Sequence, residues 1–454
     1  MKICLFVHCF FPEHFYGTEA YTFELARNLQ KLNHDVVVVT STFIGEASGG
    51  DLISRYTYEG IPVLRIDGNR FPQHRVRDTY LQPGLTSLFE KLLLEQQPDL
   101  VHITHLINHT ASLLDVVNRL RIPAVFTLTD FFGICYTNKL EDAGGELCQG
   151  PDVMRTNCLA CYLRARSMNG SSRILRSLAP ACWRMAPFLN RLGSLSLLQK
   201  TPLGQLVADL RARPALLAKR YSYLQMVITP TRFLRNVYQR SGLSVPAQTS
   251  WFGIDIDRAP KPQRASPLPL RIGYIGQLAS HKGVDLLVRA FKALRPCTAE
   301  LNLWGPLDQN PIYARLLMRL ADGASVRFAG TFPPRRMAAV LKEIDVLVIP
   351  SRWYENSPLV MLSALACHTP VVVSAVEGLT EFVVEGHNGF SFRRGDWRHL
   401  RDQLERFVVD SNLAPQLSRT TSYPRTTLDM TKDVIATYEH VITTSLDPFA
   451  QEQS

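Results

Sequence analysis

Short runs of apolar and β-branched residues alternate with amphipathic stretches along most of the chain. In the first half, these runs predict buried β-strands at residues 3–7, 35–40, 61–66, 99–104, 122–128 and 226–229. Amphipathic stretches such as 19–32 and 80–97 lie between several of the runs and predict helices. Continuous apolar strands that are separated by helices are typical of a parallel sheet covered on both faces.

A second series of the same kind begins at residue 270. Its predicted strands are 270–275, 300–304, 325–329, 345–349 and 370–373. Its predicted helices are 284–294, 334–342, 358–367 and 379–384, and the tail from 398 to about 443 predicts two or more further helices. The expected fold class is therefore α/β, with two doubly wound, Rossmann-like domains that face a cleft.

The domain boundaries follow from where this alternation stops. We expect an N-terminal domain at 1–243, a linker at 244–269 that contains five prolines, a C-terminal domain at 270–410, and C-terminal helices at 411–454 that cross back to the N-terminal domain. The alternation also lapses at about 133–225, which predicts an insertion with a cysteine-bearing part and a basic helical part. A chain of 454 residues is long enough for two cores.

The net charge of +10 is unevenly distributed along the chain. Residues 155–220 contain twelve Lys and Arg against one acid, Asp209. Leu, Trp and Phe are interleaved with these cations, a mixture that suits an anionic membrane surface or a phosphorylated acceptor. A solvated helical surface explains the same block, and both interpretations remain open. The block contains no recognised nucleic-acid-reading motif, so we expect no nucleic-acid partner.

Three features predict a cytoplasmic protein. No apolar run reaches the ~20 residues that a membrane-spanning helix needs. The apolar start, 1–11, is followed by Pro12, Glu13 and His14 instead of a small-residue cleavage site, so it predicts a strand and not a signal peptide. Nine scattered cysteines are too few for a disulfide framework and fit a reducing compartment. The basic block would allow peripheral attachment to the inner face of the membrane.

A glycine-flanked turn with a lysine joins a predicted strand to a predicted helix. Its sequence is Gly276-Gln277-Leu278-Ala279-Ser280-His281-Lys282-Gly283. Gly276 allows a close backbone approach, Lys282 supplies a cation, and the following helix offers free N–H groups. The turn therefore predicts a diphosphate site, although an ordinary strand–helix turn with a surface lysine would carry the same residues.

The segment 350–360 also joins a strand to a helix. Ser357 is a natural N-cap and Pro358 suits the first helical position, so we expect a helix to begin here with its positive end toward the cleft. Glu355, just before this helix, can accept two sugar hydroxyls, and the alternative is that it only caps the helix. A third segment, Gly17-Thr18-Glu19, opens the first predicted helix, where a glycine would let a phosphate or sugar approach.

Four cysteines gather in one irregular stretch that ends in a C-x-x-C pair. They are Cys135, Cys148, Cys158 and Cys161. Four thiols can close a tetrahedral zinc site, although Cys135 and Cys148 do not form a second close pair. A structural zinc site and a structural segment without metal are both open at this point.

Taken together, these segments resemble the retaining GT-B glycosyltransferases of glycosyltransferase family 4. The other matching pieces are Glu24-Leu25-Ala26, Ala366-Cys367-His368-Thr369-Pro370-Val371-Val372, Gly378-Leu379-Thr380-Glu381 and Gly386-His387-Asn388-Gly389. Their order and spacing cover most of the chain outside the insertion. Related glycosyltransferases of surface-polysaccharide clusters often carry a similar cysteine-bearing segment.

The resemblance implies a role for each matched residue. Lys282 would grip the diphosphate of a nucleotide-sugar donor, and Glu355 would hold the transferring sugar. The position of Gln277 is usually an arginine with the same task as Lys282. No metal would be required, because these cations and the helix dipole neutralise the phosphates. The donor-binding set that the resemblance implies is Gly17, Gly276, Gln277, Lys282, Gly305, Asn356, Ser357, Leu359, Val360 and Ser363.

Two positions depart from the family pattern. Ser363 stands where the family has a ribose-binding glutamate, and a serine cannot accept two hydroxyls, so charge-assisted bonds of ~1.5–3 kcal/mol each are lost. Thr129-Asp130 stands where many relatives carry His-Asp near the leaving group and acceptor. His105, after another strand, is a candidate substitute, and a satisfied loop histidine is the alternative. The candidate catalytic residues are Glu355, Lys282, His105 and Asp130.

The function that the resemblance implies is retaining transfer of a sugar from a nucleotide-diphosphate donor to a glycan or lipid-linked acceptor in surface polysaccharide synthesis. Thr129 and Ser363 favour an alternative, in which a catalytically impaired relative acts as a sugar-nucleotide-binding partner subunit. A third class contains sugar-nucleotide epimerases and dinucleotide oxidoreductases. No G-x-G-x-x-G opens the first helix, which argues against a dinucleotide cofactor.

Overall fold

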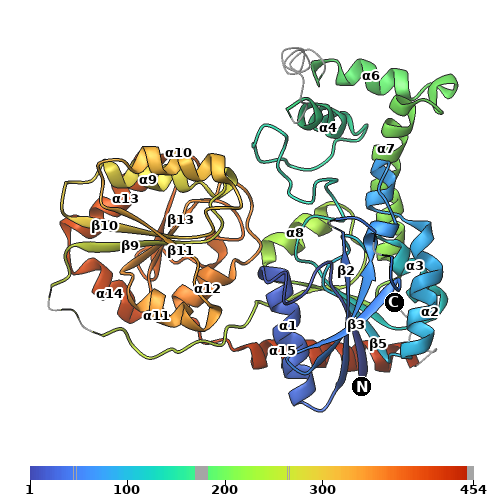
Figure 1. The fold of residues 1–454 in the computed structure, drawn as a ribbon, viewed down its shortest axis with the longest axis horizontal. Helices are drawn as coiled ribbons and strands as arrows, with labels where there is room; N and C mark the ends of the chain where they lie inside the picture. Colours follow the sequence, from blue (N-terminus) through green and yellow to red (C-terminus); the bar gives the residue numbers. More distant parts are fainter. Residues whose placement is uncertain (44, 48, 169–182, 263, 265, 447–454) are drawn as a thin grey trace. The chain divides into compact units, whose positions relative to one another are not determined.

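The computed structural model describes residues 1–43, 45–47, 49–168, 183–262, 264 and 266–446. They form two compact units (Figure 1). The first unit contains Met1–Trp251 together with the chain from Thr427 onward, and the second contains Phe252–Thr426. Part of the predicted insertion, 169–182, and the last eight residues of the predicted C-terminal helices lie outside the described residues.

The first unit is built on an eight-stranded sheet in the order β3-β4-β2-β1-β5-β6-β7-β8. All neighbouring strands are parallel except β3 and β4, which are antiparallel. The central strands consist largely of apolar residues and are buried on both faces, as in a doubly wound fold. The strands are β1 (Lys2–Phe6), β2 (Asp35–Thr42), β3 (Ile53–Tyr58), β4 (Ile61–Asp67), β5 (Leu100–Ile103), β6 (Ala124–Thr127), β7 (Met226–Thr229) and β8 (Ala247–Thr249).

The helices of the first unit include one from the far end of the chain. α15 (Thr427–Leu446) packs against α1 (Gly17–Lys31), where Asn28 Nδ2 donates to Thr427 Oγ1 at 2.8 Å. Tyr438, on the same helix, bonds through its hydroxyl to Nδ1 of the buried His102 at 2.5 Å. The other helices are α2 (Thr86–Gln96), α3 (Ser112–Arg119), α4 (Thr156–Met168), α6 (Ala186–Gly193), α7 (Pro202–Tyr221) and α8 (Arg232–Arg240).

The second unit has a six-stranded, wholly parallel sheet in the order β11-β10-β9-β12-β13-β14. Its strands are β9 (Leu270–Ile275), β10 (Ala299–Trp304), β11 (Val326–Gly330), β12 (Val346–Ile349), β13 (Val371–Ser374) and β14 (Gly389–Phe392). Its helices are α9 (Val284–Lys292), α10 (Pro311–Ala321), α11 (Met337–Lys342), α12 (Leu359–Ala366), α13 (Trp397–Val409) and α14 (Leu413–Thr420). These helices enclose a core of aliphatic and aromatic side chains.

The structure differs from the sequence-based elements at several places. The helix predicted at 379–384 is only a 3-10 turn, Thr380–Phe382. β8 lies inside the stretch predicted as a linker, 244–269, and the first unit extends to Trp251. α14, which falls in the predicted C-terminal segment 411–454, belongs to the second unit by its packing.

In each sheet the strand order reverses at one point, between β1 and β5 in the first and between β9 and β12 in the second. In open α/β sheets, ligands bind beyond the carboxyl ends of the strands at this switch point, because the loops there diverge to opposite faces and leave a crevice. The segments after β9 and β12 are the two that the sequence singles out for phosphate and sugar. None of the helices in the described part of the chain is both long and apolar enough to cross a bilayer.

Candidate functional site

The two chemistry-bearing segments of the second unit meet at its switch point. Lys282 lies in a 3-10 turn that follows β9, and Glu355 lies in the loop that follows β12. Nζ of Lys282 is 2.7 Å from Oε1 of Glu355, so the two side chains form an ion pair. Lys282 also lies over the ring of Trp353, with 4.8 Å between Nζ and the ring centroid.

Glu355 is held as a carboxylate although it is buried, with 7% of the residue exposed. Besides Lys282, Ser351 Oγ donates to Oε1 at 2.5 Å and Trp353 Nε1 donates at 3.0 Å. Burial acts to raise the pKa of Glu355, but the charge of Lys282 and these hydrogen bonds outweigh it and leave the pKa below its ordinary value. All three of these bonds reach Oε1, so among the described residues Oε2 is the oxygen left to accept hydroxyls.

Two glycines make the close approach of these loops possible. Gly283 has φ +68°, and a Cβ there would lie 2.0 Å from the carbonyl oxygen of Pro350. Gly378 has φ +83°, and a Cβ there would lie 1.5 Å from the carbonyl oxygen of Glu355. Only glycine combines a left-handed backbone with this contact, so both positions fix where Glu355 lies.

Arg352 clamps the loop after β12 onto the turn after β9, a role that sequence reasoning did not identify. Its guanidinium bonds both oxygens of Asp285, on α9, at 2.7 and 2.8 Å. It also donates to the carbonyl of Ser280 at 2.7 Å, and its backbone N–H donates to the carbonyl of His281 at 2.8 Å. Tyr313 OH completes the set by donating to Asp285 Oδ1 at 2.6 Å. Such a bidentate pair fixes the orientation of the loop after β12 relative to α9 and the turn after β9. Arg352 therefore positions Lys282 relative to Glu355.

The start of α12 differs from the prediction. Pro358 is the N-cap with φ −66° and ψ 119°, the helix begins at Leu359, and the N-cap residue makes no side-chain capping bond. Ser357 is not the N-cap, because it precedes Pro358 and has φ +62°. Its buried hydroxyl has no hydrogen-bond partner among the described residues. The N–H groups of Leu359 and Val360 remain at the first turn of the helix, where such groups have no intrahelical acceptor.

The remaining donor candidates lie on the same carboxyl edge or just behind it. Gly276 and Gly305 follow β9 and β10, and a Cβ on Gly305 would lie 2.2 Å from the carbonyl oxygen of Gly276. Gln277 is half-buried and accepts a bond from Tyr274 OH at its backbone carbonyl, 2.6 Å away. Ser363 is buried within α12, and Asn356 lies half-buried before it.

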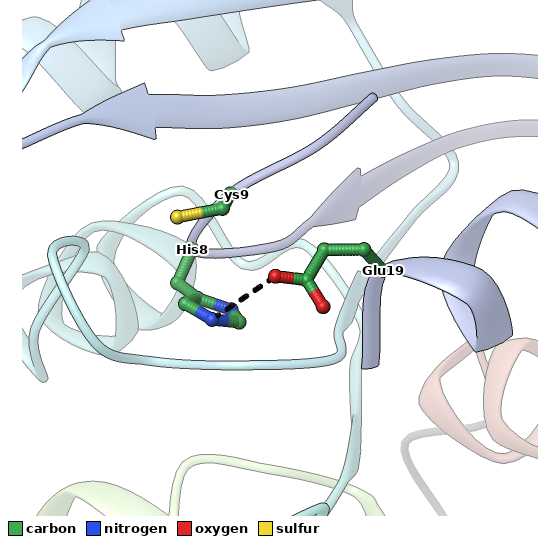
Figure 2. Close-up of side chains that lie close together, drawn as sticks. All are labelled: His8, Cys9 and Glu19. Atoms are coloured by element: carbon green, nitrogen blue, oxygen red, sulfur yellow. Dashed lines mark ion pairs between the residues drawn. The ribbon is translucent and has the colours of Figure 1, made fainter. Parts of the chain in front are cut away.

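In the first unit, side chains gather at the switch point between β1 and β5. His8 follows β1, and its Nε2 is 3.4 Å from Oε1 of Glu19, near the start of α1 (Figure 2). Burial and the neighbouring histidines hold the pKa of His8 well below its usual value, whereas burial raises the pKa of Glu19. Both shifts act against the charged form of the group. His8 was not identified from the sequence, because a single histidine at the end of an apolar run gives no distinctive pattern.

His105 and Asp130, which the sequence proposes as candidates, are brought together. His105 Nε2 lies 3.1 Å from Asp130 Oδ2, and its Nδ1 accepts the N–H of Ile107 at 3.0 Å. Nδ1 as an acceptor leaves the proton on Nε2, which donates to the carboxylate. The His105 ring packs on His8 with centroids 4.2 Å apart. Both nitrogens of His105 have partners, so it is suited to orient Asp130.

Thr129 and Gly17 complete the first-unit candidates. Thr129 Oγ1 donates to the carbonyl of Thr104 at 3.0 Å. Thr129, which departs from the family pattern, is therefore bonded to the backbone just after β5. Gly17 is the first residue of α1, and no atom lies within 4 Å of a Cβ built there. The space at the start of this helix is therefore open.

His8, Cys9 and Glu19 are also potential metal ligands. Their ligand atoms lie within 4.8 Å of one another, and they form the one such group of three or more in the described ranges. Figure 2 shows His8 turned toward Glu19 while the Cys9 thiol points elsewhere. Burial raises the pKa of Cys9 to about 12, so its thiol stays protonated. The trio is better explained by the contact between His8 and Glu19 than by a cation.

Two family models match the chain, one in each unit. Residues 15–139 match the model described as Glycosyltransferase Family 4, and residues 269–410 match Glycosyl transferases group 1. The matched ranges contain Glu19, His105 and Asp130 in the first unit and Lys282 and Glu355 in the second. The chain belongs to glycosyltransferase family 4. Most of the insertion at 133–225 lies outside both matched ranges.

Known glycosyltransferases resemble parts of this family 4 chain in sequence. A D-inositol 3-phosphate glycosyltransferase of Stackebrandtia nassauensis is 36% identical over 161 residues, which are 33% of this chain and 35% of the relative. The chain thus spans about a third of the length of the curated relatives it matches first.

Solved structures match over nearly the whole length. Sucrose-phosphate synthase from Thermosynechococcus elongatus has a TM-score of 0.59 at 16% identity and covers 99% of this chain and 98% of its own. Anabaena Alr3699/HepE, crystallised with UDP, has a TM-score of 0.61 at 16% identity. The match covers 97% of this chain and 100% of that structure's chain. Likeness at this identity establishes the GT-B fold of two parallel-sheet α/β domains.

Proposed function

We propose that this protein transfers a sugar, with retention of anomeric configuration, from a nucleotide-diphosphate donor held by its second unit. The ion pair between Lys282 and Glu355 at the switch point carries the proposal. A cation and a carboxylate at this place match the two halves of a nucleotide sugar, since the ammonium complements the diphosphate and the carboxylate accepts sugar hydroxyls. Oε2 of Glu355 is the acceptor for those hydroxyls.

Donor binding exchanges the partners of Lys282. The free protein neutralises the ammonium with Glu355, and a diphosphate brings two or more further negative charges to the same turn. The N–H groups at the start of α12 add their positive partial charge, as helix N-termini do toward phosphates. Anabaena Alr3699/HepE has been crystallised with UDP and with UDP-glucose, so uridine diphosphate sugars are the first donors to test here.

Transfer with retention requires only charge stabilisation and positioning from the protein. The bond between the anomeric carbon and the β-phosphate oxygen breaks, and the acceptor oxygen bonds to the same face of that carbon. The acceptor proton passes to the departing phosphate, whose growing charge is stabilised by Lys282 and the first turn of α12. In the first unit Asp130, oriented by His105, would bind an acceptor hydroxyl in place of the histidine that Thr129 replaces.

Release of nucleoside diphosphate from UDP-, GDP- and ADP-hexoses, with and without lipid-linked and glycan acceptors, tests this function. We expect one donor to bind in calorimetry and to turn over, and Asp130→Asn to lower turnover at least tenfold with unchanged donor affinity. Asp51→Asn, at an exposed position of the same unit, is the matched control and keeps full activity. Donor binding without turnover for every acceptor would instead support the partner-subunit alternative that Thr129 and Ser363 favour.

The proposed acceptor is a glycan or lipid-linked sugar in surface polysaccharide synthesis, reached at the cytoplasmic membrane face. α7 runs from the sheet of the first unit out to α4 and α6 (Figure 1). On α6 and beside it, the exposed apolar side chains of the described residues include Met185, Phe188, Leu195 and Leu197, the last 92% exposed. Exposed cations interleave with them: Arg184, Arg191 and Lys200. Apolar and cationic side chains on one exposed helical segment suit the interface of an anionic membrane.

Other cations of the basic block are used inside the unit. Arg213 is buried, and Asp209, the block's acid, pairs with Arg75 from outside the block at 2.6 Å. Arg220 pairs with Asp115 at 2.9 Å. These cations are used within the first unit, so the membrane proposal concerns α6 and the turn after it.

Sedimentation with phosphatidylglycerol-containing vesicles tests the membrane contact. We expect Leu197→Glu to lower the bound fraction at least fivefold, because it places a carboxylate against apolar lipid and repels anionic headgroups. Ile312→Glu is the matched control, since Ile312 is 75% exposed but lies on α10 in the second unit. Binding that ignores lipid charge and salt, or equal loss in both variants, would contradict the proposal.

A further inference from the structure

The four cysteines of the insertion line one cavity of about 280 Å³. Cys135 and Cys148 lie on the loop that follows β6, whereas Cys158 and Cys161 lie one turn apart on α4. Residues three apart in a helix share a face, so the helix presents both of its thiols to the loop. All four are free cysteines.

Hydrogen-bond partners already contact three of these sulfur atoms, and Cys148 Sγ itself donates to the carbonyl of Gly150 at 3.5 Å. The backbone N–H of Gly150 is 3.4 Å from Cys148 Sγ, and Tyr136 OH donates to Cys161 Sγ at 3.3 Å. Thr137 Oγ1 lies 3.1 Å from Cys135 Sγ. Hydrogen-bond partners of this kind are the outer contacts that orient ligands in metal sites.

The four thiols share this one cavity, but their sulfur atoms are not gathered around a single point. In the described ranges no three of them bring sulfur atoms within 4.8 Å of one another, so closure around an ion requires side-chain rotation about Cα–Cβ.

We propose that Cys135, Cys148, Cys158 and Cys161 bind one structural Zn²⁺ that fastens the loop to α4. Four thiolates at ~2.3 Å in a tetrahedron are a preferred zinc set, and all four positions are filled, which leaves none for a reacting water. The ion would bind with loss of the thiol protons to solvent. This site is separate from the donor site and does not depend on the proposed transfer.

The zinc would fix a segment that begins beside the candidate acceptor residues. Phe132 is two residues after Asp130 and donates its N–H to Asp130 Oδ1 at 2.9 Å. Gly133 donates to Tyr238 OH at 2.9 Å, and that hydroxyl donates to the carbonyl of Asp130 at 3.1 Å. The start of the segment is thus tied to α8, and zinc would tie its other end to α4.

Elemental analysis of the full chain, purified without an affinity tag after expression with added zinc, tests this proposal. We expect about one zinc per chain in the natural protein, and at least a fivefold lower content in Cys158→Ser/Cys161→Ser. Cys297→Ser, which changes an exposed cysteine of the second unit, is the matched control and keeps its zinc.

Cobalt substitution keeps the test decisive if the double variant does not fold. Natural protein reloaded with Co²⁺ should show the sulfur-to-cobalt charge-transfer and tetrahedral d–d bands of a tetrathiolate site. Absence of metal in the natural protein, zinc retained by the double variant, or iron with acid-labile sulfide in place of zinc would each overturn the proposal. None of these readouts requires sugar transfer.

Discussion

Lys282→Met is expected to lower kcat/KM for sugar transfer about a hundredfold to a thousandfold, as removal of one preorganised charge-stabilising group does. The ammonium of Lys282 pairs with Glu355 at 2.7 Å and lies over the ring of Trp353. Methionine keeps the length of the stem but removes the charge, so diphosphate binding and stabilisation of the departing phosphate fail together. Initial-rate kinetics and calorimetry with the donor measure the two effects.

Glu355→Gln separates sugar recognition from diphosphate recognition. Glutamine cannot accept two hydroxyls as a carboxylate does, so we expect a similar loss of transfer with nucleoside diphosphate affinity largely retained. Lys292→Met, on the same unit's α9, is the control for loss of one exposed ammonium. Equal activity of Lys282→Met and Lys292→Met would contradict the proposed donor site.

The pH dependence of stability gives this pair a second readout. The folded-state pKa of Glu355 is lowered, so its stabilising contribution is present above the ordinary carboxylate pKa and is lost as pH falls through the folded value. The difference in melting temperature between the natural protein and Glu355→Gln should therefore persist below the ordinary glutamate range and vanish only in stronger acid. A difference that disappears near the ordinary value would contradict the lowered pKa.

Gly283→Ala is expected to destabilise the second unit by roughly 3 kcal/mol, the sum of left-handed backbone strain and a backbone clash. The new Cβ would lie 2.0 Å from the carbonyl oxygen of Pro350, which is backbone and cannot turn away. For a unit of this size the melting temperature should fall by about 6–12 °C. Because relief of the clash separates Lys282 from Glu355, donor affinity should fall as well.

Gly323→Ala is a closely matched control for this substitution. Gly323 has φ +72°, close to the +68° of Gly283, but no atom lies within 4 Å of a Cβ built there. We expect this substitution to lower the free energy of unfolding by only the left-handed backbone strain, about 1 kcal/mol, and to leave donor affinity unchanged. Equal destabilisation by both substitutions would show that the approach of Gly283 to Pro350 is not what holds the two loops together.

The apolar runs predicted most of the sheet because burial on both faces leaves a continuous hydrophobic signal. The ranges 226–229 and 270–275 agree with β7 and β9 to the residue. β3 was missed because it is an edge strand whose polar side chains face solvent. β8 was missed because its residues, Ala247–Thr249, sit among prolines and are only half-buried.

The candidate donor residues could be predicted only as pieces of sequence. Lys282 and Glu355 lie 73 positions apart, and their contact at 2.7 Å depends on the strand order that places β9 beside β12. Arg352 was visible in its segment, but its clamp on Asp285 requires a partner 67 positions away. The conformation of Ser357 could not be foreseen either, since its residue type favours a cap and tertiary packing imposes φ +62° instead.

The return of the chain to its first unit at Thr427 has a consequence for biosynthesis. A ribosome delivers the chain from the N-terminus, so the sheet containing His102 emerges long before Tyr438, its partner on α15, can reach it. The second unit, encoded in between, is complete first. A nascent chain stalled before residue 427 would therefore present a finished second unit together with a first unit that still lacks one of its covering helices.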